Sequence, residues 1–324
     1  MIRLLFIFFT IVLLLILTAI SYRPSLDSYS KYFNLNKNTQ SSYKATFLGA
    51  SSLLISDGNT HILIDGFITR PNIYALLFTK IKPNNKLIQN TLKKLNIKKL
   101  DLIIALHSHH DHVMDSALVA IQTDAVLLGS QSTANIAKSV GFEKTEILRG
   151  KTSIKVGEFF LTAIPSLHTR MSEKIEAIIG IGEKVTGEFK SPSYFTSYKE
   201  DSTYSLFIEH KKGNVFINGS TNFVKGALKN YRANTVFLGI AKLGKTQKDF
   251  QHEYFDELVL SLKAKRVIPI HWDDFTKNIN DKTIPMPFIV DNFDLSMEFL
   301  IEQTQKNNIS LDLMGIFDSI ALDK

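Results

Sequence analysis

The sequence predicts an α/β fold in which two mixed β-sheets pack face to face and helices cover their outer surfaces, an αββα sandwich. Residues 45–64 contain short β-type runs separated by a Ser-Asp-Gly-Asn turn, a pattern typical of antiparallel strands. The middle of the chain then alternates strands with helices, as expected for outer helices that cover the sheets. With 324 residues, 44% of them hydrophobic, the chain can bury a large core, and global disorder is excluded.

The elements are predicted from the spacing of apolar residues. The expected strands are short apolar runs, whereas the expected helices repeat apolar residues every three or four positions. We expect strands at 45–49, 53–55, 61–65, 102–106, 125–128, 152–156, 158–164, 206–208, 215–217, 236–239, 266–270 and 310–314, and helices at 84–95, 114–121, 132–140, 250–262 and 293–303.

The N-terminal residues 4–20 form a nearly uninterrupted apolar run after Arg3. The run is long for the core of a signal peptide and near the lower limit for a membrane-spanning helix. We therefore expect residues 1–22 to be an uncleaved membrane anchor, with a cleaved signal as the alternative. The folded domain is expected on the exported side, periplasmic or extracellular, but basic residues on both sides of the run leave a cytoplasmic orientation open. A polar linker is expected over 23–42 and the folded domain over 43–324.

The composition limits the kinds of partner and the kinds of chemistry that the chain can have. The formal net charge is +7, but basic and acidic residues are interspersed, which indicates a solvated surface with some attraction to anionic lipid and makes nucleic acid an unlikely partner. The absence of cysteine excludes disulfides, thiolate ligands and a cysteine nucleophile. The sequence does not predict an oligomeric state.

One segment carries the chemistry. Directly after the apolar run 102–106, the six residues 107–112 contain four histidines and an aspartate: His107, His109, His110, Asp111 and His112. Polar groups buried in such a place cost several kcal/mol unless they are paired, so binding of a cation is the simplest explanation. Imidazole suits zinc, and the carboxylate adds an oxygen ligand. A histidine-rich loop without a metal, or a purely structural metal site, is the alternative.

The spacing of these residues divides them into two sets. Alternate side chains of an extended segment share a face, so His107 and His109 can bind one ion, while Asp111 and His112 face a second position. The pattern H-x-H-x-D-H resembles the signature of the metallo-β-lactamase superfamily, and the resemblance extends from about residue 43 onward. It implies the metallo-β-lactamase fold and a metal-dependent hydrolase.

The resemblance implies further site residues. His168, 56 residues after His112, stands where the superfamily has the third ligand of the first metal, and His271 follows the apolar run 266–270 where it has the last ligand of the second. Asp65 corresponds to an acidic residue that supports the metal loop, although a simple turn residue is an equal interpretation. Asp273 or Asp274 is expected to hydrogen-bond an imidazole, with surface carboxylates as the alternative.

The main departure from the family pattern is Ser220. Family members generally have Gly-Asp-Thr here, and that aspartate bridges the two metals, whereas this chain has Gly219-Ser220-Thr221. We therefore expect one tightly bound zinc and a second that is weaker or absent, with manganese or iron as the alternative metals. Trp272 is expected to pack as a lid. Residues 171–201 lack a clear period and are expected to shape specificity, with a plain surface loop as the alternative.

These observations predict a membrane-associated, zinc-dependent hydrolase. Three histidines leave one position of zinc open for a water that becomes a nucleophile at neutral pH, and Asp111 is the expected catalytic residue that orients this water or takes its proton. The resemblance implies an ester, lactone, amide or phosphoester substrate, either a small molecule or lipid-linked. A non-catalytic metal-binding protein that retains the fold is the alternative.

Overall fold

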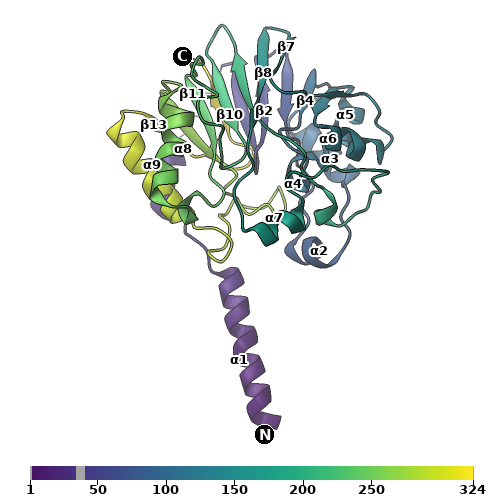
Figure 1. The fold of residues 1–324 in the computed structure, drawn as a ribbon, viewed down its shortest axis with the longest axis vertical. Coiled ribbons are helices and arrows are strands. Elements are labelled where there is room, and N and C mark those ends of the chain that lie inside the picture. Colours follow the sequence, from purple (N-terminus) through teal and green to yellow (C-terminus); the bar gives the residue numbers. More distant parts are fainter. Residues whose placement is uncertain (1, 34–40, 324) are drawn as a thin grey trace.

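The computed structural model describes residues 2–33 and 41–323, and the side chains of part of the N-terminal helix. It confirms the predicted sandwich, with two seven-stranded mixed sheets between outer helices (Figure 1).

The first sheet comes from the first half of the chain, with one strand added from the C-terminal end. In spatial order its strands are β14 (Ser319–Ala321), β1 (Lys44–Gly49), β2 (Ser52–Ser56), β3 (His61–Ile64), β4 (Leu102–Ile104), β5 (Val126–Gly129) and β6 (Thr145–Ile147). Neighbours from β14 to β3 are antiparallel and those from β3 to β6 are parallel. The turn between β2 and β3 is stabilised by Asp57, whose Oδ1 accepts hydrogen bonds from the amides of Asn59 and Thr60.

The second sheet repeats this plan with the second half of the chain. Its strands, in spatial order, are β13 (Ser310–Leu311), β12 (Arg266–Ile270), β11 (Thr235–Gly239), β10 (Val215–Asn218), β9 (Thr203–Glu209), β8 (Phe159–Ser166) and β7 (Thr152–Val156). Neighbours from β7 to β10 are antiparallel and those from β10 to β13 are parallel.

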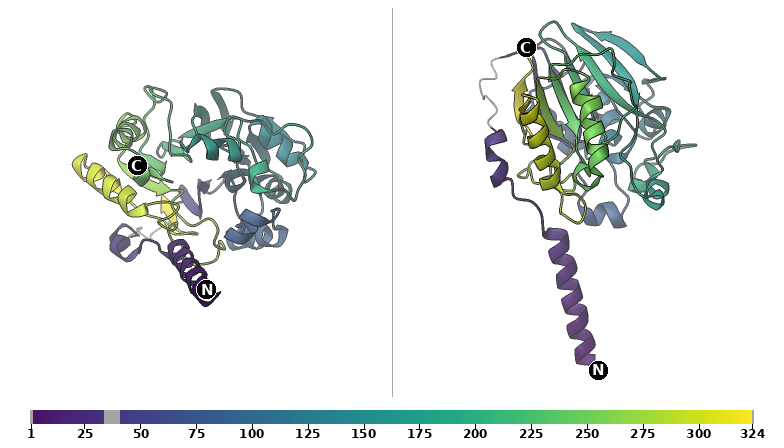
Figure 2. Two further views of the ribbon diagram at one scale, coloured as in Figure 1. Left: turned by 60° about the horizontal axis from the view of Figure 1, so that its bottom comes forward. Right: turned by 60° about the vertical axis from the view of Figure 1, so that its left-hand side comes forward.

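Helices cover the outer face of each sheet (Figures 1 and 2). The first sheet is covered by α3 (Asn85–Lys94), α5 (Ser116–Thr123) and α6 (Gln131–Lys138), and the second by α8 (Lys248–Phe255), the π-helical turn η4 (Asp256–Leu260) and α9 (Phe293–Lys306). Side-chain oxygens cap three of these helices at their N-termini, as polar residues do for free amides: Asn84 on α3, Ser130 on α6 and Asn292 on α9.

The core has three layers, as the sandwich requires. Phe47, Leu206 and Ile268 belong to a central cluster that joins the facing sides of the two sheets. Leu127 belongs to a layer under the helices of the first sheet, and Tyr254 to one under the helices of the second. The inner layer ends where the strands end, and the site lies at that edge.

The N-terminal segment forms α1 (Ile2–Ser21), which extends away from the sandwich (Figures 1 and 2). A span across the hydrocarbon core needs about 20 consecutive apolar residues. Within 2–33 and 41–323, no helix is long and apolar enough to cross a membrane. The prediction of a membrane-anchored protein with an exported domain is therefore wrong.

The polar linker expected over 23–42 is only partly described, because residues 34–40 lie outside the described residues. Its first part lies on the domain: the 3₁₀ helix η1 (Asp27–Phe33) buries Tyr29, whose hydroxyl donates a 2.8 Å hydrogen bond to Asp294. The backbone carbonyl of Tyr32 accepts a hydrogen bond from Leu313, at 2.8 Å. The described part of this segment therefore packs on the domain, while the division of the chain at residue 43 stays a prediction.

Candidate metal centre

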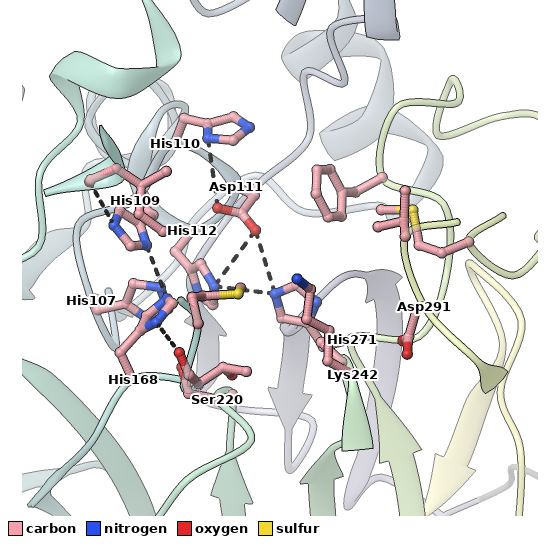
Figure 3. Close-up of a pocket in the computed structure, with 18 of the residues that line it drawn as sticks. His107, His109, His110, Asp111, His112, His168, Ser220, Lys242, His271 and Asp291 are labelled. Carbon is pink, nitrogen blue, oxygen red and sulfur yellow. Dashed lines mark hydrogen bonds and ion pairs between the residues drawn. The ribbon is translucent and has the colours of Figure 1, made fainter. Parts of the chain in front are cut away.

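The first cluster brings together His107, His109 and His168 at the ends of strands β4 and β8 (Figure 3). The chain stays extended at His109, which is the N-cap of the short helix α4 (His110–Val113), so His107 and His109 reach the same position. The candidate ligand atoms of the three imidazoles lie within 4.8 Å of one another. The structure thus gathers the three residues that the sequence assigned to one ion.

The imidazoles of His109 and His168 face each other through two nitrogens that both lack a hydrogen. His109 Nε2 lies 3.1 Å from the carbonyl oxygen of Ile179, and His168 Nδ1 lies 2.9 Å from that of Thr169. A carbonyl only accepts, so each of these ring nitrogens carries the hydrogen. The remaining nitrogens, His109 Nδ1 and His168 Nε2, are then lone pairs 3.1 Å apart. A cation bound between the two nitrogens would remove the repulsion between their lone pairs.

Protonation of one ring is an unfavourable substitute for that cation. Burial lowers the pKa of His109 to about 3 and that of His168 to about 4. Burial also holds the pKa of His107 well below its ordinary value, and neither ring nitrogen of His107 has a hydrogen-bond partner in the part of the chain that the structure describes. Buried polar atoms without partners are rare in proteins. Three neutral imidazoles with free nitrogens are a donor set that fits a divalent metal.

The second cluster consists of Asp111, His112 and His271, again with ligand atoms within 4.8 Å of one another. Asp111 Oδ2 lies 3.4 Å from His271 Nε2 and 3.9 Å from His112 Nε2, and the two imidazole Nε2 atoms are 3.3 Å apart. His271 follows β12 in a left-handed conformation, with φ 59°. The two clusters adjoin, because the ring centroids of His107 and His112 are 3.5 Å apart (Figure 3).

Charge differs between the clusters. Burial acts to raise the pKa of Asp111, but the neighbouring His112 and His110 outweigh it and hold that pKa well below its usual range. Burial acts to lower the pKa of His112, but Asp65 and Asp111 outweigh it and raise that pKa. The second cluster therefore carries a carboxylate that stays ionised, whereas the first is neutral.

Asp65 supports the metal loop, as the resemblance implied. Its Oδ2 lies 2.8 Å from His112 Nδ1, and its Oδ1 accepts a 2.7 Å hydrogen bond from the amide of Leu106. This directs the Nε2 of His112 toward the second cluster. Ser51 also contributes, because its hydroxyl donates to Asp65 Oδ2 at 2.5 Å and lies 2.9 Å from His112 Nδ1. Sequence reasoning missed Ser51, since nothing in its neighbourhood distinguishes it from a turn serine.

His110 belongs to neither cluster. Its ring makes edge contacts with the aromatic rings of Phe67, Phe195 and Phe275, at centroid distances of 6.0, 5.8 and 6.1 Å. Its Nδ1 lies 3.7 Å from Asp111 Oδ1. His110 therefore packs behind Asp111.

Ser220 lies where the departure from the family pattern placed it, in the loop after β10. It is 4% exposed and lines the same cavity as both clusters. The amide group of Asn218 fixes this loop by donating to the backbone carbonyls of Ser220 and Asn222. The same amide group also donates a 3.0 Å hydrogen bond to the hydroxyl of Tyr254.

The expected roles of the three residues after His271 are wrong. Asp273 pairs with Arg70 at 2.8 Å and Asp274 pairs with Arg23 at 2.9 Å, so neither carboxylate has an imidazole as its partner. Trp272 is 1% exposed and packs on Phe293 at a centroid distance of 5.0 Å, so it is a core residue and no lid.

A cavity of about 250 Å³ opens over both clusters. Its floor is polar and its walls are mostly apolar; the wall residues include Leu76, Met171, Ile175, Ile179, Phe195, Phe275, Met286 and Val290. Lys242 and Asp291 lie on the side of the second cluster (Figure 3). Burial lowers the pKa of Lys242 and raises that of Asp291. Several wall residues come from 171–201, the segment expected to shape specificity.

Comparison with known proteins agrees with this geometry. Residues 45–171 match the metallo-beta-lactamase superfamily. A UPF0173 metal-dependent hydrolase from Christiangramia forsetii is 32% identical over 100 residues, which is 31% of this chain and 38% of that protein. One from Oenococcus oeni is 26% identical over 239 residues, 72% of this chain and 86% of that protein. The chain thus spans less than half of the Christiangramia relative.

Solved structures share the fold at low sequence identity. Igni18, a metallo hydrolase from Ignicoccus hospitalis, superposes with a TM-score of 0.53 and 16% identity over 86% of this chain and 97% of its own. An isothiocyanate hydrolase from Delia radicum gut bacteria superposes with a TM-score of 0.55 and 14% identity over 87% of this chain and 100% of its own.

Proposed function

We propose that this chain, of which residues 45–171 match the metallo-beta-lactamase superfamily, is a metal-dependent hydrolase of small-molecule substrates. The observation that carries the proposal is the pair of free nitrogens, His109 Nδ1 and His168 Nε2, which face each other at 3.1 Å in a buried, neutral cluster. Such a pair is explained by a bound cation. The relatives named metal-dependent hydrolases support the same activity.

His107, His109 and His168 would hold the first metal, and Asp111, His112 and His271 the second. Neutral imidazoles favour zinc, with manganese or iron as the alternatives. When bound, a divalent ion supplies Lewis acidity and lowers the pKa of a water from about 15.7 toward about 7. We propose that the first site is tight and the second weaker or empty, because Ser220 stands where relatives generally have a bridging carboxylate.

Asp111 is the proposed catalytic residue. It borders the cavity at the junction of the two clusters and remains ionised, so its carboxylate can orient the attacking water and accept its proton. His112 and His271 lie within 4 Å of Asp111 Oδ2 and restrict its orientation. The apolar walls exclude bulk water, which strengthens these interactions. The arrangement suits an ester, lactone, amide or phosphoester bond.

A second candidate is a metal-binding protein that has lost hydrolytic activity, and Ser220 is the observation that favours it. A neutral hydroxyl in place of a bridging carboxylate is compatible with metal binding and leaves the second site short of one anionic ligand.

The test is a substrate screen on the full chain, loaded separately with zinc, manganese and iron. Aryl esters, lactones and bis-phosphodiesters are offered to the wild type and to Asp111→Asn. A metal-dependent activity that falls at least about a hundredfold in Asp111→Asn supports the proposal, because general acid–base catalysis contributes about 10²–10⁴-fold. Stoichiometric metal with no turnover of any substrate would favour the non-catalytic candidate.

A further inference from the structure

An apolar surface continues outward from the walls of the cavity. Helices α2 (Ile73–Phe78) and α7 (Glu173–Ile179) lie at the edge of the sandwich that holds the clusters (Figures 1 and 2). Leu76 of α2 and Ile175 and Ile179 of α7 line the cavity. The same helices and the nearby loop expose five large apolar side chains that are 52–68% exposed: Tyr74, Leu77, Phe78, Ile178 and Ile289. We call these five residues the rim.

The apolar side chains of helix α7 are not part of the hydrophobic core. An ordinary surface helix turns its apolar residues toward the protein interior. In α7, by contrast, none of the residues is buried, although three of the seven are isoleucines. In α2 only Leu76 is buried. Large patches of exposed apolar side chains on a globular domain mark interaction sites.

Continuity with the cavity identifies the occupant. Ile175 and Val290 line the cavity and are themselves 42% exposed, so the apolar wall passes into the rim without a polar boundary at these positions. A molecule whose reacting bond lies over the clusters and whose remainder is apolar would cover both. A second copy of the chain would cover the rim but would not enter the cavity.

We infer that the substrate is an acyl compound whose aliphatic chain leaves the cavity between α2 and α7 and lies on the rim. This inference rests on the proposed hydrolase function and names its substrate class. For an acyl ester, the oxygen of water bonds to the acyl carbon and the bond to the leaving alcohol breaks. One proton of the water goes to the alcohol and the other is released as the carboxylate forms.

The first experiment compares p-nitrophenyl esters with acyl chains of two to ten carbons on the metal-loaded full chain. We expect kcat/KM to rise about two- to fourfold per added methylene, which is the gain expected from burying each one. Ile175→Asn should reduce the ratio of decanoate to acetate kcat/KM by roughly tenfold. Ile121→Asn is the matched control, because Ile121 is a similarly exposed isoleucine on α5 (48% against 42%) that does not line the cavity.

The second experiment does not depend on catalysis. Binding of decanoate and butyrate to the metal-free protein is measured by titration calorimetry; both ligands carry the same carboxylate, so their difference reports the chain. Decanoate should bind at least about tenfold more tightly, and Ile175→Asn should remove most of this preference.

The outcomes separate the inference from the proposed function. If no substrate is turned over but decanoate still binds more tightly than butyrate, the proposed hydrolase function is wrong and the binding site for an apolar chain is supported. If the esters are hydrolysed but kcat/KM does not change with acyl-chain length, the hydrolase function is supported and the inference about the acyl chain is overturned. A dimer that Ile178→Asn converts to a monomer, together with equal binding of the two carboxylates, would assign the rim to self-association and also overturn it.

Discussion

The guanidinium Nη1 of Arg70 lies 2.8 Å from Oδ2 of Asp273, and both side chains are 1% exposed. The other oxygen of Asp273 accepts a 2.7 Å hydrogen bond from the amide of Ala50, and Arg70 Nη2 donates to the carbonyl of Leu48 at 3.1 Å. The amide of His271 donates to the carbonyl of Ala50, at 2.7 Å. The ion pair therefore fastens the segment that holds His271 to the turn between β1 and β2. Gly49 is required in this turn, because its φ is 87° and a side chain there would collide with Arg70.

Arg70→Met should lower the free energy of unfolding by about 3–5 kcal/mol, because it leaves the buried carboxylate of Asp273 without its counter-ion. It should also weaken metal binding at the second cluster, since His271 loses its anchored backbone. Urea unfolding and zinc titration measure the two effects. Lys211→Met is the control, because it breaks an exposed ion pair with Glu158 and should cost less than about 1 kcal/mol. Equal destabilisation by the two variants would contradict this account.

His109→Ala should lower bound metal and turnover together, because it removes one of three imidazoles from the first cluster. Elemental analysis of the purified protein measures the metal, and His252→Ala, which changes an exposed histidine on α8, controls for the loss of an imidazole. Full metal content in His109→Ala would show that this cluster is not the tight site.

Ser220→Asp should strengthen the weaker metal site. Two divalent ions about 3.5–4 Å apart repel each other, and a carboxylate between them offsets this repulsion better than a hydroxyl. Zinc titration of the metal-stripped wild type should show one tight event, with any second event at least about tenfold weaker, which is ~1.4 kcal/mol. Ser153→Asp adds the same charge on exposed β7 and should leave both events unchanged. Two equally tight ions in the wild type would refute the role given to Ser220.

The stability of the protein should depend on pH through Asp115, a buried carboxyl group that belongs to neither cluster. Burial raises the pKa of Asp115 to about 6, against the opposing hydrogen bonds from Thr69 and Ile68. Below the ordinary value of 3.8 the folded and unfolded states are both protonated; between 3.8 and 6 only the unfolded state ionises. The contribution of Asp115 to stability is therefore present at low pH and is lost as the pH rises through about 6.

The variant Asp115→Asn removes this dependence. Relative to it, the wild type should lose ~3 kcal/mol of stability between about pH 4 and pH 7, since one pKa unit corresponds to about 1.36 kcal/mol. Urea unfolding at several pH values measures the difference. Asp281→Asn changes an exposed carboxylate and controls for the lost charge. A constant difference between wild type and Asp115→Asn across this range would contradict the prediction.

The fold was predictable because the sheets depend on local patterns. Apolar runs such as those of β4 and β12 are visible directly in the sequence, whereas the convergence of the histidines that follow strands of the two sheets was expected only from the resemblance to the metallo-β-lactamase superfamily. Helix α7 was missed although its isoleucines have the i, i+3, i+4 spacing of a helix, because the pattern covers only seven residues within a long polar segment. The partner of Asp273 was missed because Arg70 lies 203 positions away and only the folded chain brings the two together. The localisation was wrong because it rested on the apolarity of one segment.

The last strand, β14, has a consequence for the order in which the protein can form. It pairs with β1, through Lys44 with Ala321, and so closes the edge of a sheet that otherwise consists of the first half of the chain. During synthesis, the ribosome completes β1 well before β14 exists. The backbone groups of β1 then remain open to pairing with other chains for most of translation. Protection of this edge depends on a strand that is made long after β1, so a nascent chain that stalls before residue 319 would expose an edge that β14 covers in the folded chain.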